Sequence, residues 1–325
     1  MDTSTGNFRE KLDELFPGAI LEGQFVERAV RGLKSAGFSG ENSIACVGVC
    51  RDELCDPFVH EVIARFGPTF GMRGLGGFLS CGNTGFGAAH AHSPVVDGRR
   101  RFVYFVAPHI AIDELGAVGS VQRPGITLKS SACGALRAFA SEMESGKVDL
   151  KLDLADLEQS MLKQALAAKL TPKNGRAKRA ADCEVVSLAE LTKLAERVIA
   201  KDQLQTHIDT TVDTFKADYA VVAGIQVHGP QGETYFCQVP EHCITCVKGK
   251  VSPLRINGNE QKANSRISMP RGWSMVLVAS LVWQLLRHLP GCLAAWLTDR
   301  RPVLTVGSCF SRIPTLEHEI KSAKR

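Results

Sequence analysis

Two cysteines and one histidine stand at the ends of predicted structural elements of this chain. Cys50 directly follows the apolar run Ser43–Val49. His109 follows a second run, Arg101–Pro108, and Cys133 comes 24 residues later. Thiolates and imidazoles are ligands that zinc prefers, and three protein ligands leave a fourth position open, as in catalytic zinc sites. These residues therefore predict a three-ligand zinc site with one open position.

The segments around these residues predict an α/β fold. Short apolar or β-branched runs predict buried strands, at 43–49, 101–107 and 219–228, with 233–239 returning as a hairpin partner. Helical spacing predicts helices at 8–15, 24–34, 53–66, 132–144, 154–170 and 187–205. This alternation predicts a mostly parallel sheet flanked by helices. Because ligands of such sheets bind outside the carboxyl ends of the strands, Cys50 and His109 are well placed. The glycine-rich stretch Phe66–Gly87 is expected to be a loop with one strand near Gly77–Ser80.

The composition of the chain argues against several classes of function. The net charge is only +5 and aromatic residues make up 6% of the 325 residues, which argues against a nucleic-acid partner. Eleven cysteines, an odd number, indicate a reducing compartment rather than a disulfide framework. The polar N-terminus carries no clear targeting signal. Two apolar segments near the C-terminus, Trp273–Leu286 and Leu289–Leu297, are each shorter than the ~20 residues that span a bilayer. We therefore expect them to form a core or partner-facing helix, and membrane binding is not expected.

Four motifs resemble the limiting-CO2-inducible protein B/C family, whose members are similar to β-type carbonic anhydrases. The resemblance covers about Phe8 to Val239. The motifs are Cys50-Arg-Asp-Glu53, the segment Gly82–Pro94 (GNTGFGAAHAHSP), Pro108-His-Ile110 and Ser131-Ala-Cys-Gly134. The resemblance implies a β-carbonic-anhydrase-like α/β fold with Zn²⁺ on Cys50, His109 and Cys133. It also implies reversible hydration of CO2 to bicarbonate by a homodimer, or by a hetero-oligomer with a paralogue, in the plastid or the cytoplasm.

The resemblance further implies that Asp52 either caps the zinc or releases it to water. β-Type enzymes pair this aspartate with an arginine four residues after the cysteine, where this chain has Leu54. Arg51 is the nearest replacement and Arg73 is a second candidate. His92 could shuttle protons or line the pocket, although a loop histidine that caps backbone groups is an equal alternative.

Two other function classes remain open from the sequence. In the first, Asp52 locks the zinc or the arginine is misplaced, and the protein is a catalytically silent structural or regulatory partner. In the second, a thiol-redox protein, the motif Cys243-Ile-Thr-Cys246 would carry the chemistry. We expect a zinc domain over residues 1–241. The atypical tail 242–325 is either an interaction segment or an artefact of the gene model.

Overall fold

A computed structural model describes residues 4–170 and 186–256 of the chain. The α-helices are α1 (Ser4–Leu15), α2 (Glu22–Ser35), α3 (Asp56–Phe66), α4 (Gly82–Ala91), α5 (Gly134–Ser145), α6 (Leu157–Ala167), α7 (Leu188–Arg197) and α8 (Gln205–Thr211). Four 3₁₀ turns are η1 (Glu53–Cys55), η2 (Leu75–Gly77), η5 (Pro230–Gly232) and η6 (Pro240–His242), and a π-helical turn, η4 (Val198–Leu204), joins α7 to α8. The strands are β1 (Ile20–Leu21), β2 (Ile44–Val49), β3 (Phe70–Gly71), β4 (Val95–Val96), β5 (Arg99–Ala107), β6 (His109–Ala111), β7 (Ser120–Val121), β8 (Ser130–Ser131), β9 (Ala217–His228), β10 (Thr234–Gln238), β11 (Ile244–Val247) and β12 (Lys250–Pro253).

The long strand β9 is the centre of the main sheet, and all twelve of its residues are buried. The sheet has the order β1-β10-β9-β5-β2-β3. β2, β3 and β5 run parallel, and β9 is parallel to β5 and β6. β10 and β11 pair with β9 in the antiparallel direction. The predicted α/β class with a mixed, mostly parallel sheet is therefore confirmed.

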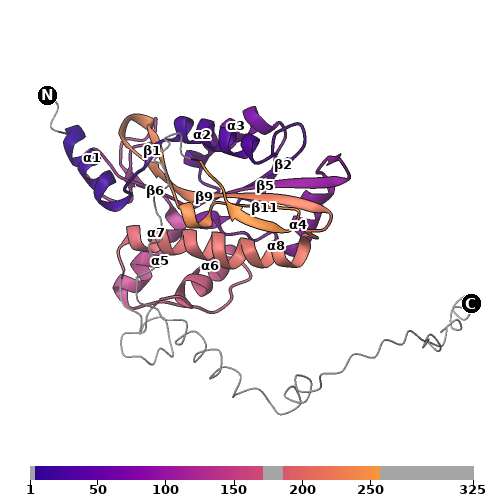
Figure 1. The fold of residues 1–325 in the computed structure, drawn as a ribbon. Helices are drawn as coiled ribbons and strands as arrows, with labels where there is room; N and C mark the ends of the chain where they lie inside the picture. Colours follow the sequence, from indigo (N-terminus) through magenta and orange to yellow (C-terminus); the bar gives the residue numbers. More distant parts are fainter. Residues whose placement is uncertain (1–3, 171–185, 257–325) are drawn as a thin grey trace, which may run out of the picture. The chain divides into compact units, whose positions relative to one another are not determined.

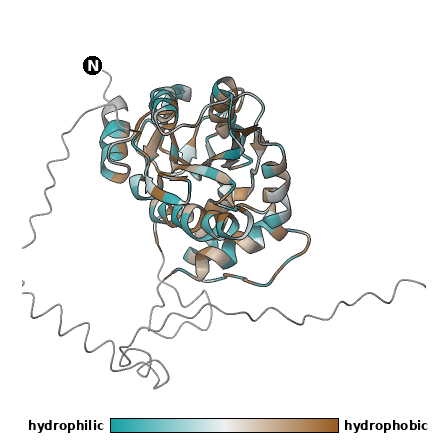
Figure 2. Cartoon of the chain, turned by 45° about the vertical axis from the view of Figure 1, so that its right-hand side comes forward, coloured by the Kyte–Doolittle hydropathy of each residue, from teal (hydrophilic) through white to brown (hydrophobic). Residues whose placement is uncertain are grey.

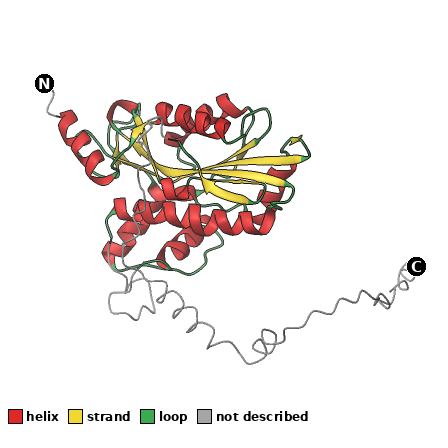
Figure 3. Cartoon of the chain, in the orientation of Figure 1, coloured by secondary structure: helices red, strands yellow, loops and turns green. Residues whose placement is uncertain are grey.

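Helices cover both faces of this sheet (Figures 1 and 3), with α2 and α3 on one face and α5 to α8 on the other. The first interface is aromatic: Phe25 of α2 stacks on Phe236 of β10, with ring centroids 3.8 Å apart. Phe58 of α3 packs on the same ring at 5.5 Å. Each fully buried aromatic side chain contributes about 2–3 kcal/mol of transfer free energy. Hydrophilic and hydrophobic residues alternate along the covering helices (Figure 2), as expected for helices with one buried face.

The glycine-rich stretch differs from the prediction. A strand near Gly77–Ser80 is wrong, because Gly76 and Gly77 adopt φ values of 62° and 85° and form the tight turn η2 instead. The following residues, expected to be loop, form the helix α4. α4 is stabilised by tertiary packing, since Phe86 and His90 are buried against the aromatic residues of β5.

The sheet continues past the domain boundary predicted at residue 241. β11 pairs with β9 and also with β12, and Cys243, Leu254 and Ile256 belong to the core. The domain that carries this sheet therefore extends at least to Ile256. The two apolar C-terminal segments lie outside the described residues. Within the two described ranges, none of the helices has the length and apolar content of a bilayer-spanning segment.

Candidate metal centre

Three separate elements place Cys50, His109 and Cys133 at one edge of the sheet. Val49, the last residue of β2, lies opposite Ala107, the last residue of β5. Cys50 follows the first strand at once, and His109 opens β6 two residues beyond the second. Cys133 precedes α5 as its N-cap residue. The carboxyl ends of two neighbouring parallel strands and one helix N-terminus thus converge, as the sequence predicts.

The side chains of these residues meet in a buried cluster that could hold a metal ion. Their candidate ligand atoms all lie within 4.8 Å of one another. The two sulfur atoms are 4.0 Å apart. Cys50, His109 and Cys133 are 3%, 0% and 1% exposed. Two sulfur donors and one nitrogen donor at such spacing suit a tetrahedral zinc ion.

One polar atom of this cluster lacks a protein partner, as suits a metal ligand. His109 Nε2 is buried and has no hydrogen-bond partner among the described residues. A buried unpaired nitrogen costs about 1–3 kcal/mol, which coordination would offset. Cys133 lies at the N-terminus of α5, where the helix dipole favours a thiolate. The donor set therefore fits zinc.

The two thiols are strongly coupled. Contact with Cys133 first, and then with His109, holds the pKa of Cys50 well below its usual range despite burial. Contact with Cys50 and burial raise the pKa of Cys133 well above its usual range. Zinc binding would displace any proton that the two sulfur atoms carry, because the metal takes thiolates.

Asp52 lies beside this cluster and is held by Arg123, a residue that sequence reasoning did not single out. Arg123 Nη2 lies 2.9 Å from each carboxylate oxygen of Asp52. The Arg123 guanidinium also donates to Glu53 and to the Ser131 carbonyl. Asp52 Oδ2 is 3.8 Å from His109 Nε2. The carboxylate therefore lies beside His109, and Arg123 holds both of its oxygens.

The expectation that Arg51 replaces the missing arginine is wrong. Arg51 turns away and forms a two-point ion pair with Glu158 of α6, with contacts of 2.6 and 3.0 Å. Glu158 also accepts hydrogen bonds from Ser80 Oγ and from the Leu75 amide. The hydrogen bonds from Arg51 are the main reason that the pKa of Glu158 is lowered to about 2. Arg51 thus ties the segment that follows Cys50 to α6 instead of pairing with Asp52.

Arg73, the second candidate, touches the backbone of the site and not the Asp52 carboxylate. Its guanidinium donates to the carbonyls of Cys50 and Asp52, both at 3.0 Å, and to the Asp56 carboxylate at 2.6 Å. Arg73 therefore shapes the loop that carries the first cysteine. Its neighbour Gly74 forms a bridge with Cys50, and a Cβ atom there would overlap the Phe78 carbonyl oxygen.

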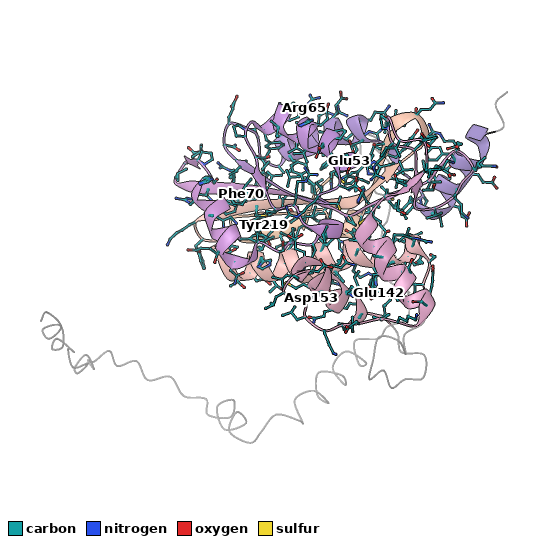
Figure 4. The ribbon with its side chains drawn as sticks, turned by 180° about the vertical axis from the view of Figure 1, so that it is seen from behind. Glu53, Arg65, Phe70, Glu142, Asp153 and Tyr219 are labelled. Atoms are coloured by element: carbon teal, nitrogen blue, oxygen red, sulfur yellow. The ribbon has the colours of Figure 1, made fainter. Side chains whose placement is uncertain are left out.

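His92 is not part of this site. It is exposed at the end of α4 and lines a cavity of about 320 Å³ with residues that include Ser43 and Phe70. Ser43 precedes β2 and Cys50 follows it, so the cavity and the cluster are separated by the length of that strand, about 20 Å. In Figure 4, Phe70 lies well apart from Glu53, which neighbours the cluster. His92 is therefore too far from the cluster of its own chain to contact a metal ion there, and its role as a proton shuttle stays a prediction.

The comparisons with known proteins agree with this geometry. The family model described as limiting CO2-inducible proteins B/C beta carbonic anhydrases matches residues 19–245. The chain belongs to this family. A crystal structure of limiting CO2-inducible protein LCIB is similar to this LCIB/C chain, with 32% identity and a TM-score of 0.60 over 76% of this chain and 98% of that one. The structure of PtLCIB4, an LCIB homologue, shares the fold at 20% identity, with a TM-score of 0.61 over 76% and 99% of the two chains. No curated protein matches the chain.

The LCIB/C chain contains a further histidine at the site that the sequence reading missed. His228, the last residue of β9, lies with its Nε2 atom 3.0 Å from His109 Nδ1. Its position at the carboxyl end of a buried strand was the available signal. Arg123 had no comparable signal, because it is in the loop between β7 and β8, 71 residues from its partner Asp52.

The cysteine pair considered for thiol-redox chemistry has the properties of core residues in this LCIB/C chain. Cys243 and Cys246 are 0% and 1% exposed. Burial raises the pKa of Cys243 to about 11 and also raises the pKa of Cys246. Reactive cysteines need a low pKa and access to solvent, so these thiols do not support a redox function.

Proposed function

We propose that the chain catalyses the zinc-dependent, reversible hydration of CO2 to bicarbonate. The observation that carries the proposal is the position of Asp52. Its carboxylate is fixed by Arg123 and directed at the buried cluster of two thiols and one imidazole. A structural zinc site would need neither a carboxylate beside an open ligand position nor an arginine to hold it.

The site residues have separate roles in this proposal. Cys50, His109 and Cys133 would hold Zn²⁺, which when bound lowers the pKa of water from about 15.7 to roughly 7. Asp52 accepts a hydrogen bond from the attacking hydroxide and so turns a lone pair towards CO2. Arg123 keeps the carboxylate in place. The hydroxide oxygen adds to the carbon of CO2 to give bicarbonate, and the proton of the consumed water leaves to the solvent.

Stopped-flow CO2 hydration by the zinc-quantified protein tests the proposal. We expect activity that is lost on zinc removal and restored by zinc, and lost together with the metal in Cys50→Ala. Asp52→Asn should retain zinc but lose activity, because the amide cannot replace the charged acceptor. Bound zinc without activity between pH 6.5 and 9 would contradict the proposal.

A catalytically silent zinc protein is the second candidate, and one distance favours it. Asp52 Oδ2 lies 3.8 Å from His109 Nε2, so a small movement would make the carboxylate a fourth zinc ligand. Cobalt substitution separates the two candidates. If Asp52 closes the site, the spectrum of the cobalt protein changes in Asp52→Asn and does not respond to added anions.

We further propose that the protein acts as a homodimer, or as a hetero-oligomer with a paralogue. The support is the family membership alone. Light scattering coupled to size-exclusion chromatography tests this directly, and a monomeric mass for the active protein would contradict it.

A further inference from the structure

We propose that His228, held by Thr234, is a positioning residue that fixes the tautomer and ring orientation of His109 towards the metal cluster. This inference deepens the proposed function and rests on it, because it takes His109 as a metal ligand. It assigns a role to a buried histidine that the chemistry above does not use.

Strand register brings the three residues together. In β6 and β9, His109 lies opposite Gln226 and Ala111 lies opposite His228. In β9 and β10, His228 lies opposite Thr234. Because paired residues, and residues two apart, project from the same face of a sheet, His109, His228 and Thr234 form a diagonal row on one face.

The contacts along this row form a continuous chain of hydrogen bonds. His109 Nδ1 is 3.0 Å from His228 Nε2. His228 Nδ1 is 3.2 Å from Thr234 Oγ1. The ring planes are 77° apart with centroids separated by 5.2 Å, so the two bonded nitrogens lie close to the line between the rings.

Only one arrangement of protons suits both this chain and a metal. A metal needs the lone pair of His109 Nε2, so the His109 proton must be on Nδ1, which donates to His228 Nε2. The proton of His228 is then on Nδ1, which donates to Thr234 Oγ1. With its own proton on Nδ1, His228 offers the lone pair of Nε2 to the His109 donor.

A second arrangement of the same side chains must be distinguished. The candidate ligand atoms of Cys55, His109 and His228 also lie within 4.8 Å of one another and could hold a second metal ion. The hydrogen bond to Thr234 favours the positioning role, because it completes the hydrogen-bonding capacity of His228 without any ion.

Zinc affinity, measured by competition with a chromophoric chelator, tests the proposal on the full chain. His228→Phe fills the space but removes the acceptor, and we expect zinc binding roughly 10- to 100-fold weaker. His228→Gln can place an amide oxygen near the lost Nε2 and should restore most of the affinity. Thr234→Val should weaken binding to a smaller degree. Tyr104→Phe is the matched control, since it breaks another buried histidine bond, to His90 at 2.6 Å, without touching the cluster.

Histidine ¹⁵N spectra of the metal-free, unmodified protein test the tautomers without relying on zinc or on a variant that folds. We expect both His109 and His228 to carry their protons on Nδ1. Any one of three results would overturn the proposal. These are a proton on His109 Nε2, an unchanged zinc affinity in a folded His228→Phe variant, and two zinc ions per chain that fall to one in this variant. If the protein binds no zinc, the proposed function fails, while the tautomer spectrum still decides this inference.

Discussion

The contact between Arg123 and Asp52 makes the sharpest prediction. Arg123→Ala removes the cation that holds both carboxylate oxygens at 2.9 Å. The side chains of Arg123 and Asp52 are only 14% and 12% exposed. Truncating one partner of a buried ion pair costs about 3–5 kcal/mol, and we expect the lower limit, about 3 kcal/mol, because both groups retain some solvent contact.

The effect on activity should be of similar size. Without Arg123 the carboxylate is free to move by an ångström or more, and a misplacement of that size costs about 100-fold in rate. Stopped-flow kinetics should therefore show kcat/KM reduced about 100-fold in Arg123→Ala, with the zinc content unchanged. Urea denaturation of the same samples measures the loss of stability.

Two further variants make this test decisive. Arg51→Ala is the matched control, since Arg51 is next to Cys50 but pairs with Glu158 on a half-exposed surface, where such pairs contribute about 0–1 kcal/mol. It should change the rate much less than Arg123→Ala. The double variant Arg123→Ala, Asp52→Asn should be no slower than Asp52→Asn alone, because the two residues act as one unit. Full activity in Arg123→Ala, or equal losses in the two arginine variants, would refute the reasoning.

Three other predictions concern positions away from this pair. Burial, reinforced by Glu61, raises the pKa of Glu22 to about 8 from the ordinary 4.5, so the native state favours the protonated carboxyl. The contribution of this group to stability is complete below pH 4.5 and is lost as the pH rises to about 8. Glu22→Gln should thus be neutral at pH 4 and stabilising at pH 8.5, by at most about 4–5 kcal/mol, in urea denaturation, and equal stability of both proteins at pH 8.5 would count against it. Gly74→Ala should cost about 2 kcal/mol or more in thermal unfolding and weaken zinc binding. Gly71→Ala is the control and should do neither, because the space around its Cβ position is open. Similar effects of both substitutions would be inconsistent with the packing. His92→Ala should leave kcat within about twofold of the parent in strongly buffered stopped-flow assays, and a loss of 10-fold or more, as expected for a general acid–base group, would reinstate it as a proton shuttle.

The sequence by itself determined the fold class and predicted the cluster of Cys50, His109 and Cys133. Cys50 and His109 end apolar segments, and a buried strand is recognisable from its own residues alone. Parallel strands that start on one side of a sheet finish on the other side together, so their C-terminal residues must converge. Cys133 opens a predicted helix, and the family motifs added Asp52 by resemblance.

Only the tertiary structure decided which residues surround that cluster. Arg123 reaches Asp52 because the loop between β7 and β8 returns to the site, and no local pattern fixes the path of a loop. Arg51, next in sequence to Cys50, is instead drawn to Glu158 on α6. His228 meets His109 through the register of β6 and β9, which packing of the whole sheet sets. Local sequence specifies the elements, whereas the pairing of distant residues depends on how those elements pack.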